Sequence, residues 1–294
     1  MTLRQITILC DGGLGNRLSG LVGGLHVAHE LGLRPTIAWP ENNWCGCSFY
    51  DLFANTNWTV TDHNVFRVFQ DNSDSVFVIH ENQTNVPLTT VLSHSTQTLD
   101  QLRGTDAPIV YYHNKLPPYV SEAEAIVQLQ QLNINSDIKQ QVNEFCQINR
   151  IDNHVAGLHL RKTENRKLDE QSLYQQVQTT PDQRYFVCSD DQATEQRFCC
   201  LPNVQAQPKT SYVEKMTAGD WYESIVDSDG RQTKYNINRS RQSVIEAFVD
   251  MLILSRTWIR PTVKSSFANF ARYFAHANIQ LNNSDHGHNE SSSS

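Results

Sequence analysis

The sequence predicts an α/β protein made of two Rossmann-like units that face each other across a cleft. The 294-residue chain is 39% hydrophobic and 19% charged, which provides apolar side chains for the cores of two ordinary domains. Strand-like and helix-like stretches alternate in two series, and a polar, helical segment at 133–153 separates them. We expect one unit at 1–150, a second at 151–280 and a disordered, low-complexity tail at 281–294.

In the first unit, a strand at 6–10 is followed by a helix at 17–32 and a second strand at 35–40. Apolar side chains recur at helical spacing in the second of these stretches, and Gly32 is placed to end the helix. The polar, Asn- and Thr-rich region 60–107 shows no pattern beyond a single strand. The remaining elements predicted here are strands at 76–80 and 108–113, and helices at 121–132 and 136–148, each helix starting at a Ser or Asp cap.

The second unit repeats the alternation of strands and helices. Its strands are predicted at 154–160, 184–190 and 257–261. Its helices are predicted at 168–178, from Asp191 onward, at 241–256 and at 265–278. Sheets of this kind bind their ligands at the turns where strands lead into helices. The residues at those turns are therefore the candidates for binding and catalysis.

Composition and charge argue against several classes of protein. The net charge of −7 and the isoelectric point near 5.9 disfavour a nucleic acid or an anionic membrane as the main partner. No stretch reaches the roughly 20 apolar residues that span a bilayer, so we expect neither a membrane segment nor a secretory signal. The seven cysteines lack zinc-site spacing, so we expect reduced thiols, no metal and a cytoplasmic location.

The first strand leads into the glycine-rich turn "CDGGLGNR". Gly12, Gly13 and Gly15 permit a tight turn and close approach of the backbone, and the free N–H groups of the next helix favour an anion. Asn16 and Arg17 can donate hydrogen bonds to phosphate or sugar oxygens. A purely structural turn explains the glycines equally well. The turn lacks the lysine of a phosphate-binding loop, and the acidic residue of a dinucleotide fingerprint is missing after the second strand.

A basic turn follows the strand at 154–160. His159, Arg161 and Lys162 lie at its carboxyl end, where an arginine can bind phosphate through two parallel N–H bonds. The alternative is a solvated basic loop. That alternative is weaker for Arg161, because the alternation of the strand aims it to the same side as His159.

Two further turns carry polar side chains. Asp190 and Asp191 follow the strand at 184–190, where they either cap the next helix or accept hydrogen bonds from a nucleoside. Ser265 and Ser266 open the last helix, where Ser266 is either a plain N-cap or part of a phosphate cradle. One basic turn, one acidic turn and one hydroxyl-rich helix start thus oppose the glycine-rich turn of the first unit. That is the layout of a GT-B glycosyltransferase with a nucleotide diphosphate between its units.

Four stretches resemble the superfamily of α-1,2-, α-1,6- and protein O-fucosyltransferases, which includes the bacterial nodulation fucosyltransferases. They are "GGLGNRLSGL", "HLRKTE", "FVCSDD" and "EAFVDMLILSR…VKSSFANFA", in the family's order along the chain. The segment 60–150 carries no matching motif. The resemblance implies a GT-B fold and an inverting, metal-independent transfer of L-fucose. The donor would be GDP-fucose, the acceptor a hydroxyl of an oligosaccharide or other glycan, and no cofactor would be needed.

The resemblance also implies roles for individual residues. It gives Arg161 the task of neutralising the leaving diphosphate, and it gives His159 and either Asp190 or Asp191 the guanosine. Three residues at the start of the last helix would cradle the phosphates, and the glycine-rich turn would line the cleft from the other unit. The expected nucleotide-sugar-binding residues are Gly13, Gly15, Asn16, Arg17, His159, Lys162, Asp190, Asp191, Ser265, Ser266 and Phe267.

This chain departs from the family pattern at two positions. Lys162 and Glu164 stand where the family signature has Arg and Asp, so a different GDP-sugar is a second interpretation of the donor. The acceptor hydroxyl also needs a proton acceptor, and Asp11 and Glu164 are the carboxylates nearest to the two turns. The catalytic candidates are therefore Arg161, Asp11 and Glu164.

Two other classes of function are alternatives to a glycosyltransferase. One is a non-catalytic nucleotide- or glycan-binding domain that keeps the GT-B fold. The other is a nicotinamide-dependent oxidoreductase, which the glycine spacing and the missing acidic residue disfavour. Release of GDP during turnover would distinguish an enzyme from a binding domain.

Overall fold

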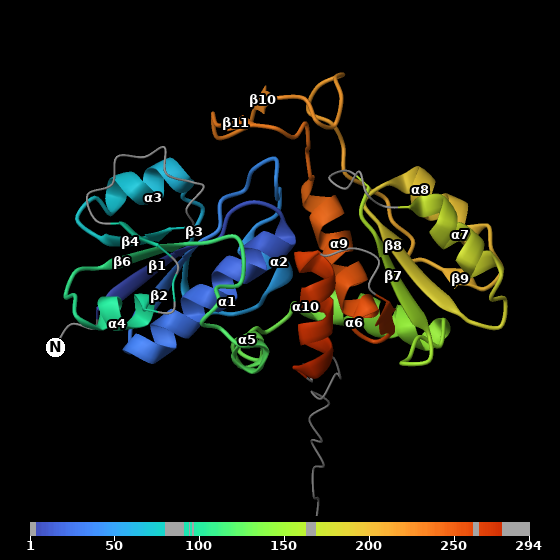
Figure 1. The fold of residues 1–294 in the computed structure, drawn as a ribbon, viewed down its shortest axis with the longest axis horizontal. Coiled ribbons are helices and arrows are strands. Elements are labelled where there is room, and N and C mark those ends of the chain that lie inside the picture. Colours follow the sequence, from blue (N-terminus) through green and yellow to red (C-terminus); the bar gives the residue numbers. More distant parts are fainter. Residues whose placement is uncertain are drawn as a thin grey trace, which may run out of the picture.

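The computed structural model describes residues 4–79, 91–93, 95, 97–162, 169–260 and 265–277. Their helices and strands form two lobes, each built on a parallel sheet, on either side of a central group of helices (Figure 1). We call them the N-lobe, with the sheet of residues 5–112, and the C-lobe, with the sheet of residues 156–260. The α/β fold class predicted from the sequence is confirmed.

The N-lobe sheet contains six parallel strands in the order β3-β2-β1-β6-β4-β5. Because β1 lies between β2 and β6, the strand order reverses beside it. The carboxyl ends of β1 and β6 therefore border the crevice in which such sheets bind ligands. The strand bounds are β1 Gln5–Leu9, β2 Arg34–Ala38, β3 Thr59–Thr61, β4 Val76–Ile79, β5 Val91–Ser93 and β6 Ile109–Tyr112.

The C-lobe sheet contains four parallel strands in the order β12-β7-β8-β9. Here β7 lies next to the reversal, so its carboxyl end borders the corresponding crevice. A short antiparallel hairpin of β10 and β11 stands apart from both sheets, at the top of Figure 1. The bounds are β7 Ala156–Leu160, β8 Tyr185–Ser189, β9 Val204–Gln205, β10 Ile225–Val226, β11 Gln232–Thr233 and β12 Trp258–Arg260.

Ten helices occur in the described part of the chain, and none of them is long and apolar enough to cross a membrane. Helix α1 ends at Gly32, which adopts φ +60° and donates its N–H to the carbonyl of His29, so the predicted stop is confirmed. The bounds are α1 Leu14–Leu31, α2 Phe49–Leu52, α3 Val65–Asp71, α4 Thr98–Arg103, α5 Glu122–Leu129, α6 Ser136–Ile148, α7 Glu170–Gln178, α8 Gln192–Cys199, α9 Arg241–Leu254 and α10 Ser266–His276.

Every strand and helix predicted from the sequence is present; the bounds of α6 are as predicted, and most other elements have shifted ends. Two predicted caps are wrong by one residue: Asn135 rather than a Ser or Asp caps α6, and Ser265 rather than Ser266 caps α10. The sequence missed only elements of seven residues or fewer, whose stability comes from packing rather than from an internal pattern. They are α2, β3, α3, β5, α4, β9, β10 and β11.

The largest of three apolar clusters extends through both lobes, and the last helix belongs to it. Helix α9 packs against α2, α6 and the strands β7 and β8, whereas α10 packs against α1, α5 and α9. The ring of Phe248 on α9 lies 5.3 Å from that of Phe53 and 5.8 Å from that of Phe274 on α10. The C-terminal helix therefore completes the core on the side of the N-lobe.

The starts of α1 and α10 touch each other at Gly15. A Cβ placed on Gly15 would lie 3.0 Å from the backbone nitrogen of Phe267, and closer still to the Ser266 hydroxyl. Only glycine leaves room for this approach. At this position the glycine is explained by a contact between two helices, in addition to any ligand.

We expect Gly15→Ala to destabilise the fold, because the new methyl group would push the starts of α1 and α10 apart. Overpacking of this kind costs about 1–3 kcal/mol of unfolding free energy, measurable by chemical denaturation. Gly104→Ala is the matched control, because its Cβ would lie 3.6 Å from the nearest atom, the Gln101 carbonyl oxygen. Adding Ser266→Gly to Gly15→Ala restores part of the loss, since it removes the closest neighbour. Equal stability of the two Ala variants would contradict this account of Gly15.

Candidate functional site

A cavity of about 1010 Å³ lies between the lobes, where the two crevices face each other. From the N-lobe it is lined by the turns after β1 and β6, the start of α1, and α3. From the C-lobe it is lined by the ends of β7 and β8, one face of α9 and the start of α10. The segment 209–239, which we call the strap, supplies further lining residues between β9 and α9.

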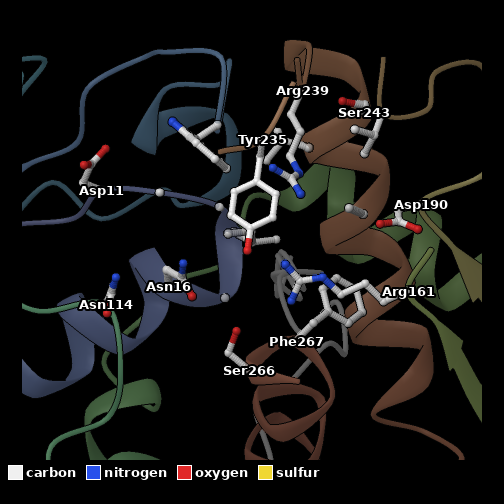
Figure 2. A pocket seen from close by; sticks show the side chains of 18 of the residues that line it. Asp11, Asn16, Asn114, Arg161, Asp190, Tyr235, Arg239, Ser243, Ser266 and Phe267 are labelled. Carbon is white, nitrogen blue, oxygen red and sulfur yellow. The ribbon is translucent and has the colours of Figure 1, made fainter. Parts of the chain in front are cut away.

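Two arginines face the cavity from the C-lobe side. Arg161 follows β7, Arg239 precedes α9, and Figure 2 shows both guanidinium groups directed into the centre of the cavity. Burial lowers the pKa of both groups, and the nearby charge of Arg239 lowers the pKa of Arg161 further. The negative charge of Asp190, at the end of β8, raises the pKa of both arginines and so opposes the effect of burial. Two like charges held close together at a cavity wall favour an anionic ligand.

Two helix N-termini lie on the same cavity wall. The cavity is lined by Gly13 and Gly15 at the start of α1, and by Ser266 and Phe267 at the start of α10. Gly13 caps α1 without a side-chain hydrogen bond. The positive ends of two helix dipoles therefore add to the field of the arginines.

His159 is buried beside this wall in its neutral form. Its ring stacks on that of Phe267, with centroids 4.4 Å apart and planes 19° from parallel, and its Nδ1 lies 3.4 Å from the hydroxyl of Ser265. Burial lowers the pKa of His159 to about 4, against the opposing charge of Asp190. The imidazole can therefore exchange hydrogen bonds with a ligand at neutral pH without adding charge.

A buried charged cluster, which the sequence did not indicate, lies at the C-lobe end of the cavity. Lys209 of the strap forms ion pairs with Glu195 and Asp250, and Tyr212 donates a hydrogen bond to Glu195. Burial raises the pKa of Asp250 to about 7, although Lys209 opposes this shift. Its Oδ1 has no hydrogen-bond partner in the described part of the chain. The sequence signal that could have indicated this cluster is the carboxyl group of Asp250 within the apolar helix run "EAFVDMLIL".

A cluster of ion pairs and hydrogen bonds, which we call the clasp, holds the strap to the N-lobe. It consists of Asp11, Asn42, Asp227, Asp229 and Arg231. Arg231 pairs with Asp11 at the end of β1, and its other nitrogens lie 3.1 Å from carboxylate oxygens of Asp227 and Asp229. Asp11 also accepts a hydrogen bond of 3.1 Å from Asn42. The clasp joins segments more than 200 positions apart and borders the cavity.

Most of the residues predicted from the sequence come together around this cavity. Those that line it are Asp11, Gly13, Gly15, Asn16, His159, Arg161, Asp190, Ser266 and Phe267. Those that do not line it are Arg17, Lys162, Asp191 and Ser265. Glu164 lies outside the described residues. The roles proposed for the lining residues remain predictions.

Arg17 stabilises the protein interior instead of lining the cleft. It is fully buried, and it donates to the carbonyl of Gly12 at 2.7 Å and to the side chain of Asn42 at 3.1 Å. Its guanidinium also lies 5.0 Å from the ring centre of Trp39. The expectation that Arg17 lines the cleft is therefore not met, because these contacts direct its side chain toward Gly12 and Asn42.

Three more predicted ligand residues make contacts within the C-lobe. The Lys162 ammonium pairs with Glu170 on α7, and only its backbone N–H reaches Asp190, at 2.7 Å. Asp191 caps α8 by accepting from Thr194, and Ser265 caps α10. Asp191 therefore has the capping role that was its structural alternative, Lys162 forms an ion pair within the C-lobe, and Ser265 takes the cap position predicted for Ser266.

The described part of the chain contains no group of three or more His, Cys, Asp or Glu side chains arranged to hold a metal ion. Its pocket-lining charges come from arginine, lysine and aspartate side chains. All seven cysteines are free, and the sulfur atoms of Cys45 and Cys47 lie 3.7 Å apart.

Comparison with known proteins identifies the fold. No protein-family model matches the chain, and no curated protein is significantly similar to it in sequence. The chain is similar to the α-1,6-fucosyltransferase NodZ co-crystallised with GDP, at 16% identity over 92% of each chain and a TM-score of 0.58. It is similar to the fucosyltransferase NodZ from Bradyrhizobium at 16% identity over 92% of each chain, with a TM-score of 0.60. NodZ soaked with GDP-fucose gives 16% identity over 93% of each chain and a TM-score of 0.55. The predicted two-unit GT-B-like fold is thereby confirmed.

We expect Asp11→Asn to destabilise the fold by about 2 kcal/mol near neutral pH, because Arg231 would lose its charged partner. Burial opposes ionisation of Asp11, yet the charge and hydrogen bonds of Arg231 lower its pKa from 3.8 to about 2. A lowered pKa stabilises the fold above the unfolded value and loses that contribution as the pH falls from about 4 toward 2. Wild type and variant therefore become equally stable at the acid end of a pH series of denaturation curves.

The control for this series is Asp100→Asn, since Asp100 forms an exposed ion pair with Arg103 at 2.6 Å. Exposed pairs contribute little, so this variant should follow the wild type at every pH. A difference between wild type and Asp11→Asn that does not depend on pH would contradict the assignment of an ionised Asp11 to the clasp.

Proposed function

We propose that the chain is a glycosyltransferase that transfers L-fucose from GDP-fucose to a hydroxyl of a glycan, with inversion and without a metal ion. One observation carries the proposal: Arg161 and Arg239 converge with the starts of α1 and α10 on a single wall of the cavity between the lobes. This wall is positively charged although the chain as a whole carries a net charge of −7. A positively charged wall would bind the diphosphate of the donor and then stabilise the same diphosphate as the leaving group.

The chemistry explains why positive charge is needed there. Transfer breaks the bond between the sugar C1 and the oxygen of the diphosphate, while the acceptor oxygen bonds to C1 from the opposite face. Negative charge then develops on the diphosphate, and preorganised cations and helix N–H groups stabilise it. Because Arg161 and Arg239 supply two charges, a divalent cation is not required in this proposal.

The nucleoside end of the proposed site offers hydrogen-bond acceptors to a purine. Asp250 lines the cavity with an oxygen that has no partner in the described residues, and Asp190 lines it from β8. A guanine base presents adjacent N–H donors, so these carboxyl groups match it better than they match adenine or uracil. The stacked pair of His159 and Phe267 provides an apolar surface near the start of α10.

The fold likeness supports the same donor. One of the similar NodZ structures was co-crystallised with GDP and another was soaked with GDP-fucose, and the alignment covers more than nine-tenths of each of these two chains. The likeness by itself concerns the fold. The donor is proposed for this chain because its own arginines and helix starts line the cavity between its lobes.

The acceptor hydroxyl must transfer its proton to a base. We propose that Asp11 holds the strap in place rather than accepting this proton, because its pKa of about 2 makes it a poor base at neutral pH. Glu164, which follows Arg161 by three positions, remains the other candidate.

The free cysteines support the proposed cytoplasmic location, since disulfides are uncommon in reducing compartments.

We expect GDP to stabilise the wild-type protein in a thermal-shift panel that also contains UDP, ADP and NAD. Arg161→Ala and Arg239→Ala should each raise the dissociation constant for GDP by about 100-fold, because each removes a pair of charge-assisted hydrogen bonds. Lys162→Ala is the matched control, because Lys162 is adjacent to Arg161 in sequence but pairs with Glu170. A preference for NAD or UDP would overturn the proposal.

We also expect transfer from GDP-fucose to continue in excess chelator, since arginines carry the charge of the leaving group. The product linkage should have the opposite anomeric configuration from the donor, which proton NMR of the first-formed product reports directly. Loss of activity in chelator, restored by added divalent metal, would overturn metal independence. Binding of GDP-fucose without any release of GDP would favour the non-catalytic alternative, and transfer of another sugar would favour the second donor interpretation.

A further inference from the structure

We propose that the acceptor is a sugar ring that stacks on Phe66 and hydrogen-bonds to Asn114 at the N-lobe end of the cavity. The inference rests on the proposed function, which already takes the acceptor as a glycan, and adds the residues that would hold the acceptor sugar. We call this part of the cavity the acceptor bay, lined by Val65, Phe66, Phe69, Tyr112 and Asn114.

The acceptor bay is continuous with the proposed donor site. Both belong to one cavity of about 1010 Å³, which is at the upper end of the range for a single small-molecule site, about 300–1,000 Å³. Figure 2 shows Asn114 on the N-lobe side of this cavity and Arg161 on the opposite side, with Asn16 and Tyr235 between them in this view. A nucleotide-sugar bound along the arginine wall would leave the acceptor bay for a second molecule.

Phe66 provides a flat apolar surface in the acceptor bay. It is 49% exposed, although its neighbours on α3, Val65 and Phe69, are each only 5% exposed. Phe69 packs edge-on against Phe77 and Tyr112, at centroid distances of 5.5 and 6.0 Å, and so fixes α3 to the sheet. The helix is therefore anchored through its buried side while the ring of Phe66 stays exposed to the cavity. The C–H face of a pyranose ring would cover it.

Asn114 supplies a polar group in the acceptor bay. It follows β6 and lines the cavity, and its Oδ1 is buried without a hydrogen-bond partner in the described part of the chain. A buried carbonyl oxygen without a partner is unfavourable, and a donor from a ligand relieves the cost. The amide offers both a donor and an acceptor, which suits a sugar hydroxyl because a hydroxyl also does both.

The form of the acceptor bay favours a sugar over a peptide. An extended peptide usually binds by pairing with the free edge of a strand. Among the described residues, the acceptor bay is lined by α3 and by the carboxyl end of β6, and none of these presents a strand edge to it. The carboxylate of Asp11, next to Tyr112, is already paired with Arg231.

The test uses the GDP-loaded, full-length protein and saturation-transfer NMR. The probes are the methyl glycosides of galactose, glucose, N-acetylglucosamine and glucuronic acid, with a Ser/Thr-containing octapeptide as the competing class. We expect sugar binding by the wild type, and Phe66→Ala and Asn114→Ala should each weaken it by about tenfold. Phe66→Tyr should restore it, because the ring face is kept. GDP affinity should be unchanged in all three variants.

Tyr50→Ala is the matched control, because Tyr50 is also 49% exposed but does not line the cavity. Equal sugar binding by wild type and Phe66→Ala would overturn the inference. So would binding of the peptide instead of sugars, or a GDP-loaded protein that binds no sugar of the panel or of a printed glycan array. Failure of the wild type to bind GDP at all would overturn the proposed function itself. A response to glucuronide alone would support a sugar acceptor and identify it as acidic.

Discussion

The close contact between the starts of α1 and α10 is the constraint on which the rest of the site depends. Gly15 has no side chain, so Ser266 and Phe267 can lie directly against it. The contact fixes two helix N-termini on one wall of the cavity, and Arg161 and Arg239 face the same space from the C-lobe. An acidic chain thereby creates one strongly positive surface out of segments that are distant in its sequence.

The carboxyl groups at the two ends of the cavity form ion pairs with other side chains rather than with the two arginines of the cavity wall. Asp11 is occupied by Arg231, while Glu195 and Asp250 share Lys209. Each of these carboxyl groups is buried against a cationic partner, Arg231 or Lys209, whose charge offsets its negative charge. The carboxylates near the cavity therefore need not cancel the field of the two arginines, and an anion can bind beside them.

The fold could be predicted from the sequence further than the site could. Long elements such as α1 carry their own spacing and stop signal at Gly32, whereas α3 has only seven residues and no such pattern. Local position also misleads about side chains: Arg161 and Lys162 are adjacent, yet one faces the cavity and the other pairs with Glu170. Arg239 and Asp250 escaped notice because their partners come from other elements, and only tertiary packing reveals them.

The packing of α10 against the N-lobe limits how such proteins can diverge in sequence and how their segments can be exchanged. Because α10 packs on α1 and α5, the first half of the chain lacks part of its own core without residues 265–277. A crossover at the middle of the sequence would join a first half to a last helix shaped for another partner. Changes in α1 and α10 must therefore be inherited together, and a functional chimera has to exchange both segments as one unit.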